Sequence, residues 1–234
     1  LYASVGASLG GMCSLLSGLL YPQYVSKIIT ISSCTSPDPT SIALRHLQRK
    51  MIMTDPNWNN GDYYEKNVYP KDGMQTASEL ATLTNRSEMV KKCFGLNRFT
   101  KLISLEPSFE IERYLHQDGE RFAEKYDPNS LLYLSKAMDL FNLSDNYDNN
   151  IQLALKQIKC PILILGARTD ILFPIWQQKQ LAEGLIEAGN QNVTFYELNS
   201  IYGHDTFLLD VNGVSTAMKG FFDVVQLYVE DDDE

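Results

Sequence analysis

A serine, a carboxylate and a histidine occur in this chain at spacings that suit nucleophilic catalysis. Ser8 lies in the G-x-S-x-G pattern Gly6-Ala7-Ser8-Leu9-Gly10, between a short apolar run and a mostly apolar stretch of helical length. A sharp strand-turn-helix at such a pattern lifts the serine hydroxyl above a sheet, and we expect Gly6 and Gly10 to supply the clearance between strand and helix. The pattern therefore predicts Ser8 as a nucleophile. The alternative is a tight turn in which Ser8 only caps the helix.

The backbone amides after Ser8 form a second part of the predicted site. Leu9 and Gly10 would stand at a helix N-terminus, where the first amides lack intrahelical partners and the helix dipole favours negative charge. We therefore expect the amide of Leu9 to contribute to an oxyanion hole.

Asp170 and His204 each follow a run of residues with strand character. Asp170 comes four residues after one such run and His204 six residues after the next. The carboxyl ends of parallel strands are where α/β sites are built. Serine, acid and histidine follow one another in the chain order of the α/β-hydrolase triad, in which the histidine takes the serine proton and the carboxylate fixes the histidine tautomer. The alternatives are a loop-closing Asp170 and a surface histidine at 204.

Four predicted strands position these residues. A mostly apolar helix at Gly11–Leu20 separates the first two strands, so we expect them to be parallel. The third is continuously apolar, which is typical of a strand covered on both faces. Further helices are expected at about Ile175–Ala188 and Val214–Tyr228. The predicted strands lie near Leu1–Val5, Ile28–Ser32, Pro161–Leu165 and Asn192–Leu198.

The strand pattern gives way to helical spacing between residues 36 and 159. Apolar residues recur there at intervals of three and four, separated by turn-forming pairs such as Asp55-Pro56 and Asp127-Pro128. His46 and His116 fall in this region with no strand end nearby and are predicted to be ordinary, partly exposed residues. We therefore predict an α/β core at 1–35 and 160–228, a helical lid at 36–159 and a solvated acidic tail at 229–234.

Composition excludes several classes of partner. A formal net charge of −9 argues against nucleic acid or an anionic membrane. No apolar run is long enough to span a bilayer. The four cysteines, Cys13, Cys34, Cys93 and Cys160, are far apart and form no C-x-x-C pair. We expect a cytoplasmic protein with no metal, disulfide or bound cofactor.

Six separated motifs together resemble the homoserine O-acetyltransferase family. The resemblance implies an α/β-hydrolase parallel sheet with an inserted helical lid, of which this chain holds the C-terminal part. It also implies transfer of an acetyl group from acetyl-CoA, as a substrate, to homoserine through an acyl-serine in methionine biosynthesis, by a homodimer formed through the lid. The motifs are Gly6–Met12, Arg49 with Met53–Trp58, Asp127–Ser130, Ala137–Asp139, Asp170–Pro174 and Tyr202–Asp205.

The resemblance assigns roles to individual residues. It gives Ser8 as nucleophile, Asp170 as orienting acid and His204 as general base. It also implies that Arg86 holds the substrate carboxylate and that Asp205 holds the substrate ammonium. The alternatives are a solvated arginine at a helix start and an N-cap at Asp205. The family motif departs here at three positions, Asn85 for Tyr, Ala7 for Gly and Lys136 for Arg.

The sequence is also compatible with other functions. Close relatives of that family use serine as acceptor or succinyl as the acyl group. An esterase would use the same triad, with water as the acceptor. A third alternative is a degenerate, non-enzymatic relative that binds or dimerises through its helices. Because Leu1 already lies in the strand that delivers Ser8, we expect the chain alone to be poorly soluble and nearly inactive.

Overall fold

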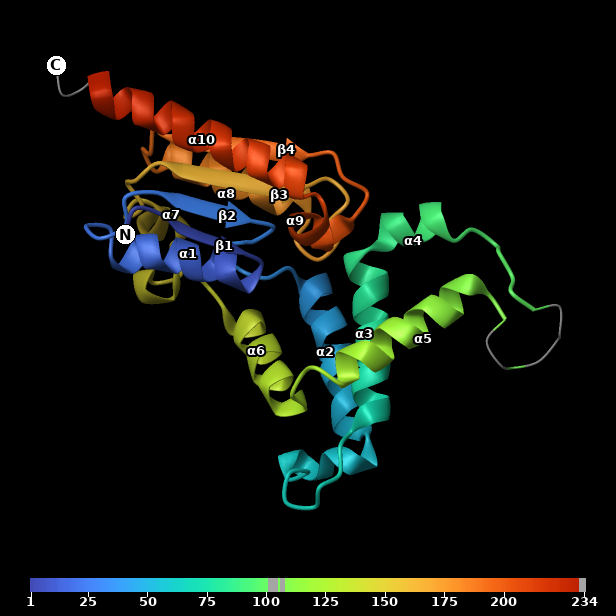
Figure 1. Cartoon of the computed structure of the whole chain (residues 1–234). Coiled ribbons are helices and arrows are strands. Elements are labelled where there is room, and N and C mark those ends of the chain that lie inside the picture. The colour runs from blue at the N-terminus through green and yellow to red at the C-terminus, as the bar shows by residue number, and fades with distance from the viewer. Residues whose placement is uncertain (101–104, 106–107, 232–234) are drawn as a thin grey trace. The chain divides into compact units, whose positions relative to one another are not determined.

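The computed structural model describes residues 1–100, 105 and 108–231. They form two compact units (Figure 1). Leu1–Pro37 and Phe141–Glu234 make up the first, which we call the α/β unit. Asp38–Leu140 makes up the second, the helical unit, which is continuous in sequence. No helix among the described residues is both long and apolar enough to cross a bilayer.

A parallel sheet of four strands lies at the centre of the α/β unit, as predicted (Figure 1). The strands stand in chain order, and β1 is paired with β2 from Ser4↔Ile28 to Ala7↔Ile31. All three pairings are parallel, so the carboxyl ends of the four strands share one edge. The strands are β1 (Ser4–Ala7), β2 (Ile28–Ile31), β3 (Ile162–Ala167) and β4 (Val193–Leu198).

Alternate side chains of β2 and β3 supply two separate hydrophobic cores. Ile28 and Ile162 pack against helices α1 (Leu9–Leu20) and α8 (Ile175–Glu187), whereas Ile29 and Leu163 pack against α10 (Val211–Asp231). Because successive side chains of a strand point to opposite faces, a continuously apolar strand is needed where both faces are covered. Every residue of β2 and β3 is buried, which confirms the prediction made for the third strand.

The N-terminal and C-terminal elements differ in extent from the prediction. The first strand begins at Ser4 rather than Leu1. Leu1 is instead tied to the loop before β2, where its amino group donates to the carbonyl of Tyr24 at 2.5 Å and its carbonyl accepts from Ser26 at 3.0 Å. At the other end α10 continues to Asp231, so the predicted tail starts inside a helix, and 232–234 lie outside the described residues.

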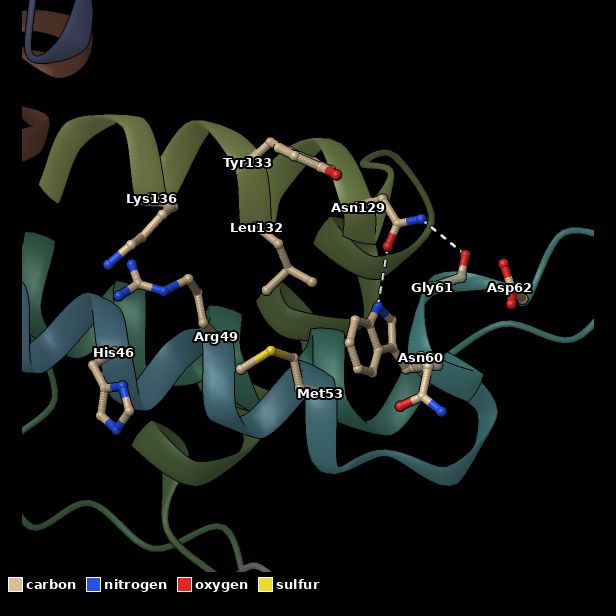
Figure 2. Close-up of a pocket in the computed structure, with 11 residues that line it drawn as sticks. His46, Arg49, Met53, Asn60, Gly61, Asp62, Asn129, Leu132, Tyr133 and Lys136 are labelled. Carbon is tan, nitrogen blue, oxygen red and sulfur yellow. Dashed lines mark hydrogen bonds between the residues drawn. The ribbon is translucent and has the colours of Figure 1, made fainter. Parts of the chain in front are cut away.

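The helical unit packs around a small apolar core. Ile52 of α2 and Met74 and Ala77 of α3 are buried there with Ala123 at the end of α5. Between α2 and α3, Asp55 accepts from the amides of Asn57 and Gly73, both at 2.9 Å, which fixes the turn. Part of α2, η1 and α6 lines a pocket within this unit (Figure 2). Its elements are α2 (Pro39–Thr54), η1 (Pro56–Gly61), α3 (Lys71–Asn85), α4 (Ser87–Cys93), α5 (Glu110–Ala123) and α6 (Pro128–Leu140).

The helical unit ends at Leu140, whereas the lid predicted from the sequence extends over residues 36–159. The segment from Phe141, with η2 (Asp145–Tyr147) and α7 (Ile151–Leu155), belongs to the α/β unit. Leu143, Leu155 and Ile158 are buried in the core that contains α1 and α8. Helical spacing alone cannot tell which core an amphipathic segment joins, so the predicted insertion is about twenty residues too long at this end.

Candidate active site

Ser8 sits at the turn between β1 and α1 in a strained backbone conformation. Its φ of 53° and ψ of −121° lie outside the regions that residues with a Cβ ordinarily adopt. The turn is held at both ends: the Ser8 amide donates to the Ile31 carbonyl at 2.9 Å, and its carbonyl accepts from the Met12 amide at 3.1 Å. The sharp strand-turn-helix that the G-x-S-x-G pattern predicts is therefore present.

The glycines around this turn do not all serve the purpose that the sequence predicts. A Cβ on Gly6 would lie 2.1 Å from the carbonyl oxygen of Gly10, so only glycine fits there. A Cβ on Gly10 would meet nothing within 4 Å. The prediction that Gly10 supplies clearance between strand and helix is therefore wrong. The close approach falls instead on Gly11, whose Cβ would lie 2.6 Å from the Cβ of Ser33. In the sequence, the only indication of this close approach is that Gly11 directly follows Gly10.

The Ser8 side chain does not cap α1, which rules out the alternative drawn from the sequence. No hydrogen bond joins the Ser8 hydroxyl to the first-turn amides of the helix. The first intrahelical bond is donated by Met12, so the Leu9 amide precedes it and points out of the helix N-terminus. An anion beside Ser8 would meet this amide and the positive end of the helix dipole.

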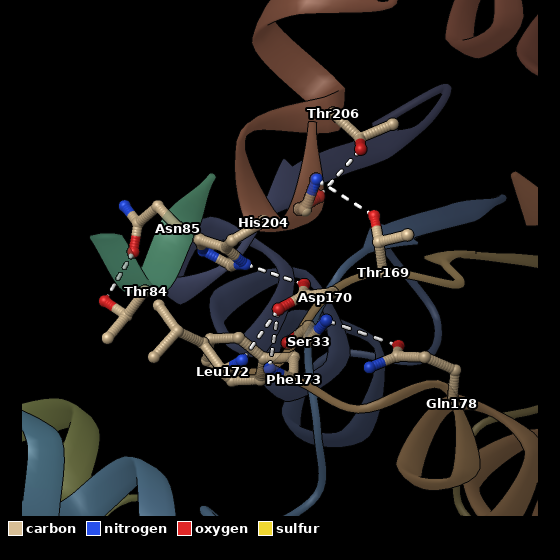
Figure 3. Close-up of polar contacts among 11 residues, drawn as sticks. Ser33, Thr84, Asn85, Thr169, Asp170, Leu172, Phe173, Gln178, His204 and Thr206 are labelled. Carbon is tan, nitrogen blue, oxygen red and sulfur yellow. Dashed lines mark hydrogen bonds and ion pairs between the residues drawn. The ribbon is translucent and has the colours of Figure 1, made fainter. Parts of the chain in front are cut away.

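Asp170 and His204 form a buried, hydrogen-bonded pair (Figure 3). His204 Nδ1 lies 2.8 Å from Asp170 Oδ2, and the two residues are 6% and 4% exposed. The other carboxylate oxygen, Oδ1, accepts from the amides of Leu172 and Phe173, both at 2.9 Å. Because an ionised Asp170 only accepts, Nδ1 must carry the proton, which leaves Nε2 of a neutral His204 as the basic nitrogen.

The loops that carry this pair are joined to each other by Thr169. Its hydroxyl donates to the Ser200 carbonyl at 2.7 Å and accepts from the Gly203 amide at 3.0 Å. Gly203 has a φ of +59°, which favours glycine directly before the histidine. The ring of Phe173 stacks on that of His204 with centroids 5.1 Å apart. No role was predicted for Thr169 or for Phe173, although Thr169 directly precedes Asp170 and Phe173 belongs to the motif Asp170–Pro174.

The three predicted triad members all follow the carboxyl ends of strands of one parallel sheet. Ser8 follows β1, Asp170 follows β3 and His204 follows β4 in the short helix η3 (Gly203–Asp205). Strands β1 and β3 are two spacings apart, roughly 10 Å, so Asp170 cannot reach Ser8 directly and a triad needs a histidine between them. The arrangement can activate a serine hydroxyl as a nucleophile.

The two residues expected to hold a substrate lie in different units of the chain. Arg86, between α3 and α4 of the helical unit, donates from Nη1 to the Tyr114 hydroxyl at 2.7 Å. It is therefore not simply a solvated arginine. Asp205 is 7% exposed and precedes α9 (Thr206–Leu209), but its side chain makes no capping hydrogen bond to that helix. Their roles toward a substrate stay predictions.

Among the described residues, no group of three or more His, Cys, Asp or Glu side chains is arranged to hold a metal ion.

Comparison with known proteins places this geometry in a family. A family model described as alpha/beta hydrolase fold matches residues 1–214. A serine O-succinyltransferase of Emericella nidulans is 40% identical, over 95% of this chain and 56% of its own length. One of Xylella fastidiosa (strain 9a5c) is also 40% identical, over 94% and 60%. The chain thus spans little more than half the length of these relatives.

Solved structures show the same architecture. Esterase E22 is similar with a TM-score of 0.83 and 26% identity, over 94% of this chain and 61% of that one. A homoserine O-acetyltransferase from Bacillus anthracis is similar with the same TM-score of 0.83 at 22% identity, over 91% and 57%. At that identity the second likeness shows the fold alone.

Proposed function

Because the chain belongs to the alpha/beta hydrolase fold family, we propose that Ser8, His204 and Asp170 form a catalytic triad for acyl transfer. The protein that contains this chain is then an O-acyltransferase, which moves an acyl group from a thioester to a hydroxyl through an acyl-serine. The observation that carries the proposal is the 2.8 Å hydrogen bond between His204 and Asp170, which supports a role for the histidine as the base.

The first half-reaction acylates the serine. His204 Nε2 takes the proton of the Ser8 hydroxyl as its oxygen attacks the thioester carbonyl. The oxyanion that forms is stabilised by the Leu9 amide at the N-terminus of α1. The intermediate collapses as the carbon–sulfur bond breaks, and His204 gives its proton to the departing thiolate. Asp170 stabilises the transient imidazolium charge, and its own charge is held by the amides of Leu172 and Phe173.

The second half-reaction runs the same proton transfers with a new nucleophile. His204 removes the proton from the acceptor hydroxyl, whose oxygen attacks the acyl-serine and forms the ester product. The proton then returns to the Ser8 oxygen, so the enzyme is regenerated with no net gain or loss of protons. An amino-acid acceptor carries an ammonium and a carboxylate, and we propose Asp205 and Arg86 as their respective partners.

The names of the relatives bear on the acceptor and on the acyl group. Both curated relatives, at 40% identity, are called serine O-succinyltransferase, which supports serine and succinyl-CoA as the first pair to test. The sequence motifs favour homoserine and acetyl-CoA instead. We therefore propose a hydroxy amino acid as the acceptor class, with serine and homoserine as the two candidates.

The test is the acyl-enzyme itself. Incubation with succinyl-CoA or acetyl-CoA, without an acceptor, should add one acyl group to Ser8 as read by peptide mass spectrometry. Ser8→Ala should abolish the adduct. Discharge of the isolated acyl-enzyme by serine and by homoserine, compared side by side, then identifies the acceptor. Acylation of Cys13 in place of Ser8 would overturn the proposal.

An esterase is the second candidate, favoured by the likeness to esterase E22 at 26% identity. The two functions differ in what discharges the acyl-serine. A transferase keeps the acyl-enzyme until an amino acid is added, whereas an esterase loses it to water at the same rate with or without one. The half-life of the adduct in buffer alone therefore separates them.

A further inference from the structure

The helical unit contains a pocket that none of the three triad residues lines (Figure 2). The pocket has a volume of about 630 Å³, within the range of roughly 300–1,000 Å³ typical of small-molecule sites. All of its lining residues come from α2, η1 and its flank, and α6, so the pocket lies entirely inside one unit.

One end of this pocket is positively charged. Arg49 and Lys136 both line it, and Figure 2 shows them at the same end of the pocket as His46. Lys136 is exposed and has no ion-pair partner among the described residues. Two cations that line one end of a pocket repel each other, and a bound anion would offset that repulsion.

The buried network behind Arg49 adds to this positive charge. Asp139 accepts from Arg45 at 2.6 Å and from Arg49 at 2.5 Å, so a single carboxylate is shared by two guanidinium groups. All three side chains are buried: Arg45 is 6% exposed, Asp139 is 3% exposed and Arg49 is 11% exposed. One nitrogen of Arg45, Nη2, is buried without a hydrogen-bond partner in the described residues. This cluster therefore carries a net charge of about +1 away from water, in a chain whose formal net charge is −9.

The rest of the pocket suits a flat, partly apolar group. Trp58 lines the pocket together with the apolar side chains of Met53 and Leu132, and its indole is held in place because its Nε1 donates to Asn129 Oδ1 at 3.1 Å. Asp62, its only acidic lining residue, lies at the opposite end from Lys136 (Figure 2). That carboxylate can accept a hydrogen bond from an amino or hydroxyl group. An aromatic ring can stack on an indole, and every nucleic-acid base has a flat face that can do so.

We propose that this pocket binds a nucleotide, with its phosphates between Lys136 and Arg49 and its base on Trp58. The shared chemistry is an aromatic base joined to a phosphate, supplied either by a free nucleotide or by the nucleotide end of coenzyme A. The proposal concerns binding in the helical unit and does not depend on acylation at Ser8.

Calorimetric titration of the full chain with ADP tests this. ADP should bind, and Lys136→Glu should weaken binding by roughly tenfold to a hundredfold, the usual value of a charge-assisted contact. Lys219→Glu, the same charge change on another exposed helical lysine, should leave the affinity unchanged. Adenosine should bind weakly and equally to the parent chain and to Lys136→Glu. Equal ADP affinity in the parent and Lys136→Glu, or no ADP binding at millimolar concentration, overturns the proposal.

Competition distinguishes the two sources of the nucleotide. If coenzyme A displaces ADP and Lys136→Glu weakens both ligands, the pocket accepts the nucleotide end of coenzyme A. If coenzyme A and ADP bind together, the pocket serves a free nucleotide. Trp58→Phe provides a second readout, since it keeps a ring for stacking but removes the indole fluorescence that ADP should quench in the parent chain.

Discussion

Two buried carboxylates, one in each unit, are held in opposite ways. Asp170 in the α/β unit is held by amides two and three residues along the chain and by the ring of His204. Asp139 in the helical unit is held by two arginines 90 and 94 residues away. Amide dipoles stabilise a negative charge without cancelling it, whereas arginines neutralise it. The charge of Asp170 can thus respond to a proton on His204, whereas the charge of Asp139 is already compensated by the two arginines.

Substitution of Asp170 should have the largest effect, and this effect should be on catalysis. Asp170→Asn keeps the shape of the side chain but removes the charge that selects the His204 tautomer. We expect the rate of Ser8 acylation to fall by about 10⁴, as is usual for this change in a triad, with the fold retained. Stopped-flow or quenched-flow measurement of the acyl-enzyme checks this. A loss below tenfold would mean that Asp170 is a loop residue only.

Asp139→Asn should act on stability instead. It leaves two buried guanidinium groups without a counter-charge, which typically costs about 3–5 kcal/mol. Chemical denaturation monitored by circular dichroism should show this loss in the unfolding of the helical unit. Glu124→Gln, at an exposed carboxylate of the same unit, should change the free energy of unfolding by less than about 0.5 kcal/mol. Equal effects of the two variants would contradict the role assigned to the Arg45 and Arg49 pairs.

A smaller difference should separate two glycines of the nucleophile turn. Gly6→Ala forces a Cβ to within 2.1 Å of a backbone oxygen, so we expect a destabilisation of about 1–3 kcal/mol. Gly10→Ala meets open space in the first turn of α1 and should be neutral, or stabilising by up to about 1 kcal/mol. Midpoints of urea unfolding for the two variants give the comparison, and a reversed order would contradict the geometry of the turn.

The smallest expected effect is on the pH dependence of stability, through the Asp127 carboxylate, which accepts hydrogen bonds from two tyrosines. Burial raises the pKa of Asp127, but hydrogen bonds from the Tyr63 and Tyr64 hydroxyls outweigh this and hold that pKa at about 2. A depressed pKa adds stability that is present above about pH 4 and lost as the pH falls toward 2. Allowing for solvent screening, we expect a loss of about 1 kcal/mol over this window. Tyr64→Phe should reduce the loss, as pH-dependent denaturation can show.

The positions of the candidate site residues were more predictable than the packing around them, for a physical reason. Ser8, Asp170 and His204 each follow a strand within a few residues, so local patterns place them at one edge of the sheet. The Asp170–His204 pair that the triad order implies is present in the structure. Their catalytic roles remain predictions.

Other features depend on contacts between residues far apart in sequence. The demand for glycine at position 11 arises from Ser33, and the partners of Asp139 lie some ninety residues before it. The segment after Phe141 reads as helical, and only its packing in the core with α1 and α8 assigns it to the α/β unit. No pattern within a short window carries such information.

The discontinuity of the α/β unit has a consequence for synthesis. Strand β3, which covers one edge of β2, is translated about 130 residues after β2. At 5–20 residues per second this is a delay of roughly 7–26 s, during which the apolar strand β2 has no neighbour on that side. The helical unit, being continuous, can fold in that interval. Chains stalled before Ile162 should therefore show a protease-resistant helical unit and a protease-sensitive N-terminal segment. Because β2 is transiently exposed in such chains, we expect a chaperone to bind there.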